Sequence, residues 1–181
     1  MTVRIRAAGP DDLETVVALR LALLHENADH PIYGRLHPEA EERAHDLFAQ
    51  QLRSAGETMF LAEDEGVVVG ILRCVESYGS PLLLPPRYGY VSSVYVVPSH
   101  RRRGVLRALL AAAEQWCRGR SLPEMRLHNV ADDPVANAAW TAMGFEVVEM
   151  VRARPVPAAP ASAGRDGARR ATRRRRGGSG R

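Results

Sequence analysis

Apolar and polar residues follow two distinct periods along the chain, and the period predicts which segments are strands and which are helices. Apolar residues at every second position are typical of strands, whereas spacings of three and four residues are typical of amphipathic helices. The strand-like runs cover residues 3–7, 58–63, 67–76, 88–97, 125–129 and 145–152. The helix-like runs cover residues 12–25, 39–54, 104–119 and 134–143. This order of elements predicts an α+β fold with a mixed sheet.

Turn-forming residues separate these elements. Residues 9–12 (GPDD) supply acidic N-cap chemistry for the first helix, and residues 64–66 (DEG) form a tight turn between two strands. Segments 25–38 and 77–87 contain several prolines and are expected to be loops, because proline cannot continue a helix or a strand ladder. The pattern predicts one domain over residues 1–155.

The composition changes in residues 156–181, which contain no aromatic residue and no aliphatic residue larger than Val. Such a segment cannot offset its ordering entropy, so we expect a disordered tail. Residues 152–181 hold ten arginines and one acidic residue, whereas residues 1–151 hold fifteen arginines and twenty acidic residues. The high pI of 9.6 therefore belongs to the tail and not to the domain. The arginine run lacks interleaved aromatic residues, so nucleic acid is not an expected partner.

Several classes of protein are excluded by what the chain lacks. No run of about 18 apolar residues is present, which argues against a membrane span, and the N-terminus has no apolar signal-peptide region. Cys74 and Cys117 are 43 residues apart without any metal-ligand spacing, which argues against a metal site or a disulfide framework. We therefore expect a cytoplasmic protein without a metal.

The run 94–106 (VYVVPSHRRRGVL) carries the clearest chemistry. The strand ends at Pro98, three arginines follow, and Gly104 stands at the mouth of a helix. The first turn of a helix has unpaired N–H groups and a partial positive charge, and arginines add permanently charged donors. A diphosphate suits such a turn, although a solvated basic turn is the simpler alternative for these residues alone.

Two motifs in this chain resemble the GNAT superfamily of acyl-CoA N-acetyltransferases. The acyl-CoA motif of this family is V-x-P-x-x-[QR]-x-x-G-x-[GA]-x-x-L. In register with it are Val96, Pro98, Arg101, Gly104, Arg107–Ala108 and Leu109. The family's downstream helix is matched in spacing by Asp133, Ala136, Trp140, Gly144 and Phe145. The resemblance covers residues 3–153. It implies a mixed, mostly antiparallel sheet of six to seven strands with splayed central strands, flanked by about four helices.

The resemblance also implies an activity and a set of site residues. The expected reaction moves an acetyl group from acetyl-CoA to a primary amine of a small molecule, by direct attack in a ternary complex. The implied cofactor-binding residues are Val94, Val96, Arg101, Arg102, Arg103, Gly104, Val105, Leu106, Asp133 and Trp140. The candidate catalytic residues are Tyr90, Ser92 and Glu76, and the candidate substrate-binding residues are Glu26, His30 and Tyr33.

Three departures from the family pattern leave the proton-transfer groups open. Leu106 replaces a small residue, Trp140 replaces the tyrosine that protonates the thiolate in many relatives, and Asp133 replaces an asparagine. Indole is too weak an acid for that role, so Tyr95, another tyrosine or water must take it. Strict alternation along the main strand places Tyr90, Ser92, Val94 and Val96 on one face and Val91, Ser93 and Tyr95 on the other.

Other functions stay open at this point. The departures are compatible with a non-catalytic acyl-CoA-binding or regulatory domain, and the acceptor is open between a small molecule and a peptide or protein. The tail is compatible with a nucleic-acid-binding role for the whole chain. The acidic domain favours a cationic acceptor through electrostatic steering, and the resemblance adds the expectation of a homodimer.

Overall fold

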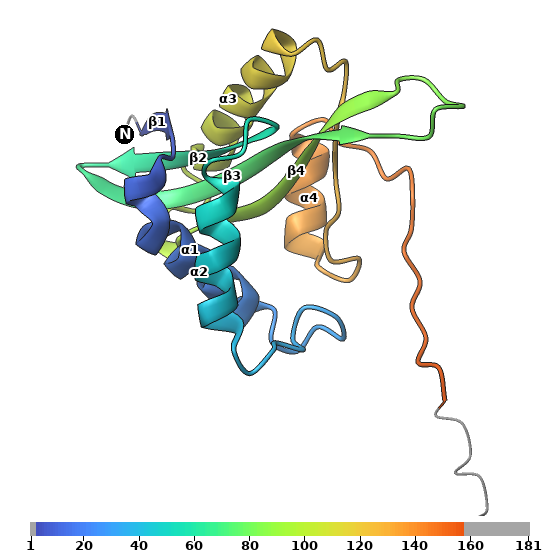
Figure 1. Cartoon of the computed structure of the whole chain (residues 1–181), viewed down its shortest axis with the longest axis horizontal. Helices are drawn as coiled ribbons and strands as arrows, with labels where there is room; N and C mark the ends of the chain where they lie inside the picture. Colours follow the sequence, from blue (N-terminus) through green and yellow to red (C-terminus); the bar gives the residue numbers. More distant parts are fainter. Residues whose placement is uncertain (1–2, 158–181) are drawn as a thin grey trace, which may run out of the picture. The chain divides into compact units, whose positions relative to one another are not determined.

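The structure, a computed structural model, describes residues 3–157 and divides the chain into two units, Met1–Glu146 and Val147–Arg181. All helices and strands of the described residues lie in the first unit (Figure 1). The strands are β1 (Arg4–Ala7), β2 (Glu57–Asp64), β3 (Val67–Tyr78), β4 (Arg87–Val96) and β5 (Met125–Leu127). The helices are α1 (Leu13–Glu26), α2 (Ala40–Gln51), α3 (Val105–Gly119) and α4 (Pro134–Ala142), with short 3-10 helices at Pro10–Asp12 and Pro98–His100.

The five strands form one mixed sheet in the order β1-β2-β3-β4-β5. Neighbouring strands run antiparallel except β4 and β5, which run parallel. These two strands pair only over Gly89–Val91 and Met125–Leu127. Beyond Val91, no described residue pairs with the β5 side of β4, and this confirms the expected splay of the central strands.

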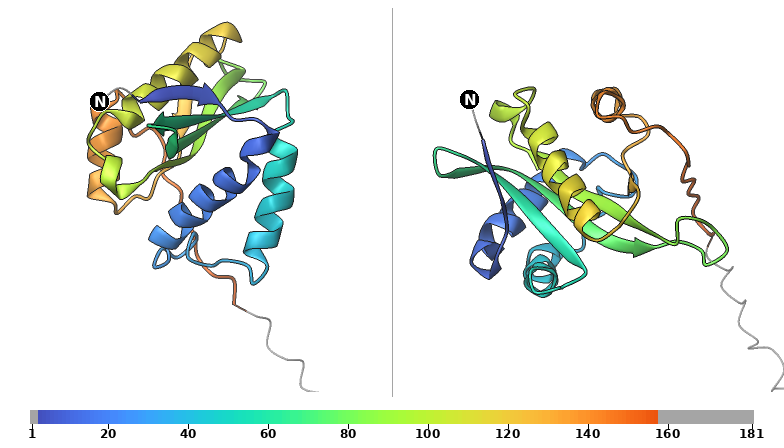
Figure 2. Two further views of the ribbon diagram at one scale, coloured as in Figure 1. Left: turned by 90° about the vertical axis from the view of Figure 1, so that its left-hand side faces the viewer. Right: turned by 90° about the horizontal axis from the view of Figure 1, so that it is seen from above.

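Helices cover both faces of the sheet (Figure 2). Helix α3 packs on one face, where Val105, Leu109 and Ala113 are buried against Leu72 and Val91. Helices α1 and α2 pack on the other face. There a second core cluster consists of Val16, Val17, Leu19, Ala44, Phe48, Met59, Leu61, Ile71 and Tyr95. The end of α4 joins the α3 side, since Trp140 and Met143 pack against the first cluster.

Two sequence-based expectations about the sheet are wrong. The sheet has five strands among the described residues instead of six to seven, and residues 145–152 contain no strand. Val147, Val148 and Met150 are 80%, 86% and 67% exposed. An alternating pattern becomes a strand only where a neighbouring edge supplies hydrogen-bond partners, and no described residue pairs with this segment.

The predictions about the C-terminal tail stay predictions. Residues 158–181 lie outside the described residues, so neither the domain boundary at residue 155 nor a disordered tail can be compared with the structure. Among the residues that are described, no helix is both long and apolar enough to cross a membrane.

We expect Gly89→Ala to destabilise the domain. The two buried thiols of Cys74 and Cys117 lie 3.7 Å apart beside this position, and a Cβ on Gly89 would lie 2.4 Å from the Cys117 sulfur. Overpacking of this kind costs about 1–3 kcal/mol, which urea unfolding measures. Gly119→Ala is the control, because a Cβ there meets nothing within 4 Å. Equal stabilities of the two variants would contradict the packing at Gly89.

Candidate active site

Strand β4 contains a β-bulge at the centre of the sheet. Ile71 pairs with Tyr95 and Arg73 pairs with Ser92, so that Leu72 alone faces two residues of β4. Ser93, one of these two, has a φ of +50°, a left-handed conformation that residues with side chains rarely adopt. A bulge bends its strand and disrupts the ladder locally. The backbone of β4 therefore changes direction just beyond the point where β5 leaves its side.

The bulge also reverses the faces that the later side chains of β4 occupy. Tyr95 is buried in the cluster under α1 and α2, whereas Val94 and Val96 pack against the cluster under α3. The expectation that Tyr90 and Ser92 share a face with Val94 and Val96 is therefore wrong. One inserted residue shifts a pattern of period two by one position, which moves every following side chain to the opposite face.

The end of β4 leads into a turn with two left-handed residues. Arg102 has a φ of +60° and Gly104 a φ of +85° immediately before α3. Left-handed residues in such a turn direct successive N–H groups to one side and form an anion-binding concavity. The N-terminus of α3 adds its unpaired N–H groups and partial positive charge at the same place.

The first side chains of α3 leave this concavity open. Val105 is 1% exposed and belongs to the core under α3, and Leu106 packs against the same core. A Cβ on Gly104 would meet nothing within 4 Å, so glycine is needed here for its backbone conformation and not for space. Leu106, although larger than the residue usual in the motif, is accommodated by packing inward. Arg102, Arg103 and Gly104 are exposed.

Arg101 is held by the end of α1. Its guanidinium donates hydrogen bonds of 2.8 and 2.7 Å to the two carboxylate oxygens of Glu26, and its Nε donates to the carbonyl oxygen of Val96 at 2.8 Å. The hydroxyl of Tyr95 donates to Glu26 at 3.0 Å. Burial and this hydrogen bond raise the pKa of Tyr95, so its hydroxyl stays protonated. Glu26 was expected on the acceptor side. It instead helps to hold the turn formed by residues 101–106, which we call the donor turn.

A second polar group lies on the α1 and α2 face of β4. The Tyr90 hydroxyl is 3.1 Å from Nδ1 of His128, and the two rings meet edge to face. The Ser92 hydroxyl accepts a hydrogen bond of 3.2 Å from Arg73, whose Nε donates to Glu57 at 2.5 Å. Burial raises the pKa of Tyr90, which keeps its hydroxyl protonated at neutral pH. The structure therefore brings Tyr90 and Ser92 together.

Glu76 does not join this group. It pairs with Gly89 in the ladder and accepts a hydrogen bond of 2.6 Å from Arg87. It lies three positions after Arg73, so alternation turns its side chain to the face opposite that of Arg73. Of the three candidate catalytic residues, Tyr90 and Ser92 share one side of the sheet and Glu76 occupies the other.

The other predicted residues belong to α4 and to the loop after α1. Asp133 caps α4, since its carboxylate accepts hydrogen bonds of 2.9 Å from the N–H groups of Val135 and Ala136. Trp140 packs edge to face on Phe145. In the loop, His30 and Tyr33 stack with their ring centroids 4.6 Å apart, and Nδ1 of His30 accepts from the Tyr33 N–H at 3.1 Å.

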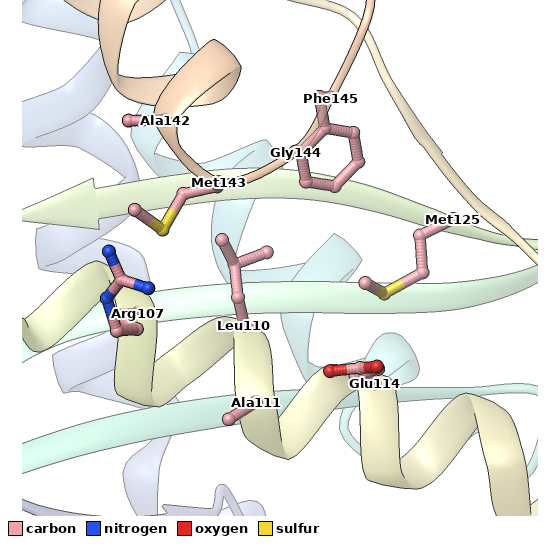
Figure 3. A pocket seen from close by; sticks show the side chains of 9 residues that line it. All are labelled: Arg107, Leu110, Ala111, Glu114, Met125, Ala142, Met143, Gly144 and Phe145. Carbon is pink, nitrogen blue, oxygen red and sulfur yellow. The ribbon is translucent and has the colours of Figure 1, made fainter.

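A separate hollow of about 390 Å³ lies between α3, β5 and the end of α4 (Figure 3). Its lining is Arg107, Leu110, Ala111, Glu114, Met125, Ala142, Met143, Gly144 and Phe145. Arg107 and Glu114 make part of this lining polar, and none of the candidate catalytic residues contributes to it.

The comparisons with known proteins agree with the motifs. Residues 22–145 match the profile of the Acetyltransferase (GNAT) family. The chain belongs to this family. An aminoglycoside N(6')-acetyltransferase type 1 of Stenotrophomonas maltophilia is 32% identical to this GNAT chain over 161 residues, which cover 87% of the chain and 95% of the relative. A protein of the same name from Klebsiella aerogenes is 41% identical over 63 residues, or 35% of this chain and 41% of that protein.

Solved structures share the fold. A GCN5-related N-acetyltransferase from Ralstonia eutropha JMP134 superimposes with a TM-score of 0.71 at 23% identity, over 86% of this chain and 99% of the other. AAC(6')-Iy, solved with a bisubstrate analog of CoA, superimposes with a TM-score of 0.67 at 23% identity, over 87% and 99% of the two chains.

Family membership fixes the reaction and the co-substrate. This chain is an N-acetyltransferase of the GNAT family, and acetyl-CoA is its co-substrate. Within residues 3–157, no group of three or more His, Cys, Asp or Glu side chains is placed to hold a metal ion.

Sequence reasoning missed Arg73 and the left-handed Ser93. Arg73 reaches Ser92 only because the two residues are paired across β3 and β4, a register that the sequence does not specify. His128 follows directly after β5, so its contact with Tyr90 depends on where that strand ends. No local signal marks Ser93, since serine is not a residue that indicates a positive φ.

We expect Ser93→Val to damage the donor site. A β-branched residue at a positive φ adds about 1–2 kcal/mol of backbone strain, which either lowers stability or removes the bulge. Unfolding in urea measures the first effect, and the KM for acetyl-CoA reports the second. Ser93→Gly, which tolerates the same φ, should keep both values close to those of the wild type. Wild-type behaviour of Ser93→Val in both assays would show that the bulge is dispensable.

Proposed function

We propose that acetyl-CoA binds along the free edge of β4, with its pantetheine arm beside Val94 and Val96 and its pyrophosphate on the turn formed by residues 101–106. The observation that carries this proposal is continuity: the unpaired edge, the bulge and the N-terminus of α3 follow one another within residues 92–105. An extended ligand adds to such an edge as a further strand. A backbone N–H near Val96 would polarise the thioester carbonyl, as in an oxyanion hole.

The acceptor amine approaches, on this proposal, from the α1 and α2 face. Tyr90, Ser92 and His128 lie there, next to the bulge. An amine attacks only in its neutral form. We assign the protonated Tyr90 hydroxyl to accept a hydrogen bond from the amine and to donate one to Nδ1 of His128. As the amine loses its proton to the Tyr90 oxygen, the Tyr90 proton passes to His128. Glu76 faces the other side of the sheet and is a weaker candidate for this role.

The departing thiolate receives no acid from Trp140. Its ring packs on Phe145, and an indole N–H is too weak an acid. The Tyr95 hydroxyl is protonated but already donates to Glu26. We therefore propose that CoA leaves as a thiolate and is protonated by water, with direct transfer in a ternary complex and no acetylated side chain.

An aminoglycoside is a second, narrower candidate for the acceptor. The relative from Stenotrophomonas maltophilia carries that substrate in its name, and the match covers 95% of its length. The acidic balance of residues 1–151 also favours the approach of a cationic amine. Aminoglycosides therefore belong in the first set of acceptors to be tested.

The test of the proposed function is release of free CoA thiol from acetyl-CoA in the presence of aminoglycosides, amino sugars, polyamines and amino acids. We expect amine-dependent thiol release together with an N-acetylated product in the mass spectrum. Tight binding of acetyl-CoA without turnover of any amine would instead support a non-catalytic acyl-CoA-binding domain. Acetylation of peptide N-termini and of no small amine would contradict a small-molecule acceptor and indicate a peptide substrate.

Assembly and nucleic-acid binding stay separate predictions. The family resemblance favours a homodimer, which light scattering after gel filtration would detect. The absence of nucleic-acid affinity is checked by titrating DNA against the full chain and against a chain truncated after residue 156.

We expect Tyr90→Phe and His128→Gln each to lower kcat/KM for the amine by about 100-fold or more, the usual contribution of positioned proton transfer. Binding of acetyl-CoA should change little, since neither side chain belongs to the donor turn. Stopped-flow or steady-state kinetics over pH 6–9 measures the first effect, and calorimetric titration measures the second. Tyr78→Phe is the matched control, because Tyr78 is 72% exposed and hydrogen-bonds only to Glu76. Equal losses in all three variants would contradict the assignment.

A further inference from the structure

Arg20 is a charged residue on the inner side of α1. It follows the buried residues Val16 and Val17 by four and three positions, so it lies on the side of the helix that faces the sheet. It is half-buried, yet no hydrogen bond or ion pair joins its side chain to any other residue within 3–157. Its guanidinium nitrogens are in contact with water and accessible to a ligand, because Gln51 Oε1 is the only buried side-chain polar atom without a partner among the described residues.

The groups around Arg20 are donors and cations. Its electrostatic neighbours are the hydroxyls of Tyr33 and Tyr90 and the guanidinium of Arg73. Burial lowers the pKa of Arg20, but a guanidinium stays charged at any physiological pH. Arg73 is neutralised by Glu57 at 2.5 Å, so the charge of Arg20 is the uncompensated one in this group.

Three other half-buried arginines among the described residues are paired with carboxylates, whereas a fourth, Arg120, donates to the carbonyl oxygen of Ala55 and lies over the Trp116 ring. Arg6, whose side chain is 29% exposed, is paired with both Asp12 and Glu63. Arg73, at 18%, is paired with Glu57. The chain thus places a carboxylate beside each of these guanidinium groups. No described residue places a carboxylate beside Arg20, and its position beside Tyr90 would put a bound anion at the acceptor side of the site.

Resting on the acetyl transfer proposed above, we propose that Arg20 binds a carboxylate of the acceptor, so that the preferred substrate is a small amine that also carries an acidic group. The planar guanidinium matches a carboxylate with two parallel hydrogen bonds. The hydroxyls of Tyr33 and Tyr90 are additional donors for the same oxygens. The amine of such a substrate would point towards Tyr90 and the bulge.

This selectivity opposes the net charge of the domain. The negative balance of residues 1–151 attracts cations from a distance. Contact with Arg20 acts over a few ångströms in a partly desolvated place, where like charges repel strongly. A polycationic acceptor therefore meets an unfavourable contact at the site itself, and an amino acid or a similar zwitterion meets a favourable one.

The experiment compares acceptors that differ by the acidic group alone, each with the wild type, Arg20→Gln and Arg20→Lys. The first pair is tyrosine and tyramine, the second pair is glucosamine 6-phosphate and glucosamine, and kanamycin is the polycation. Arg43→Gln is the control variant, because Arg43 is an exposed arginine on α2 paired only with Glu39. Kinetics with saturating acetyl-CoA gives kcat/KM for each acceptor.

We expect Arg20→Gln to lower kcat/KM for tyrosine by roughly 10- to 100-fold, the loss of a charged hydrogen bond, and to leave tyramine within about twofold. Arg20→Lys should recover part of the loss, and Arg43→Gln should change neither acceptor. A larger effect on glucosamine 6-phosphate than on tyrosine would show that Arg20 recognises a phosphate and not a carboxylate, which would overturn the proposal as stated. Equal losses for both members of each pair would overturn it as well. So would a wild type that prefers kanamycin and an Arg20→Gln variant whose kcat/KM values are unchanged.

Thermal unfolding separates this result from a failure to fold. An unpaired, half-buried cation that serves a ligand is a cost to the free protein, so Arg20→Gln should unfold at the same temperature as the wild type or a higher one. A lower unfolding temperature would show a structural role and contradict the proposal. If no amine at all is acetylated while acetyl-CoA still binds, the proposed function fails, and calorimetric binding of tyrosine to wild type and Arg20→Gln still tests Arg20.

Discussion

The left-handed conformation of Ser93 inserts one residue into the ladder between β3 and β4, and most of the site depends on that insertion. It bends β4 at the point where β5 diverges, which leaves a backbone edge for an extended ligand. It also turns Tyr95 under α1 while Val94 and Val96 pack under α3. Without the inserted residue, alternation would turn Tyr95 to the same face as Val91, which is the face that α3 covers.

The helices and the donor turn were predictable because their signals are local. Helix α3 begins beside Gly104 and ends at Gly119, as the apolar spacing indicated, and its N-terminus meets the expected turn. The faces of β4 were not predictable, because the bulge occurs at a serine and period-two alternation assumes that no residue is inserted. The strand expected over 145–152 failed for a related reason: alternation describes a strand's faces but does not supply an edge to pair with.

The residues on the proposed acceptor side of the site were the least predictable from the sequence. Its contacts join residues far apart in sequence, such as Arg73 with Glu57 and Tyr90 with His128. Which arginines lack a carboxylate depends on these long-range pairs, so the sequence alone does not single out Arg20. Glu26 illustrates the opposite case, since a residue selected for the acceptor proves to be bound to Arg101.

The ion pair between Glu26 and Arg101 joins the end of α1 to the turn that we assign to the pyrophosphate. Glu26 ends α1, just before the loop that carries His30 and Tyr33, while Arg101 opens the turn assigned to the pyrophosphate. A ligand that displaces one end of this ion pair displaces the other. Because thermodynamic coupling is reciprocal, an acceptor that tightens or loosens the hold on acetyl-CoA must have its own affinity changed by the same factor. Through this ion pair, binding at the proposed acceptor side and binding at the proposed pyrophosphate turn would influence each other.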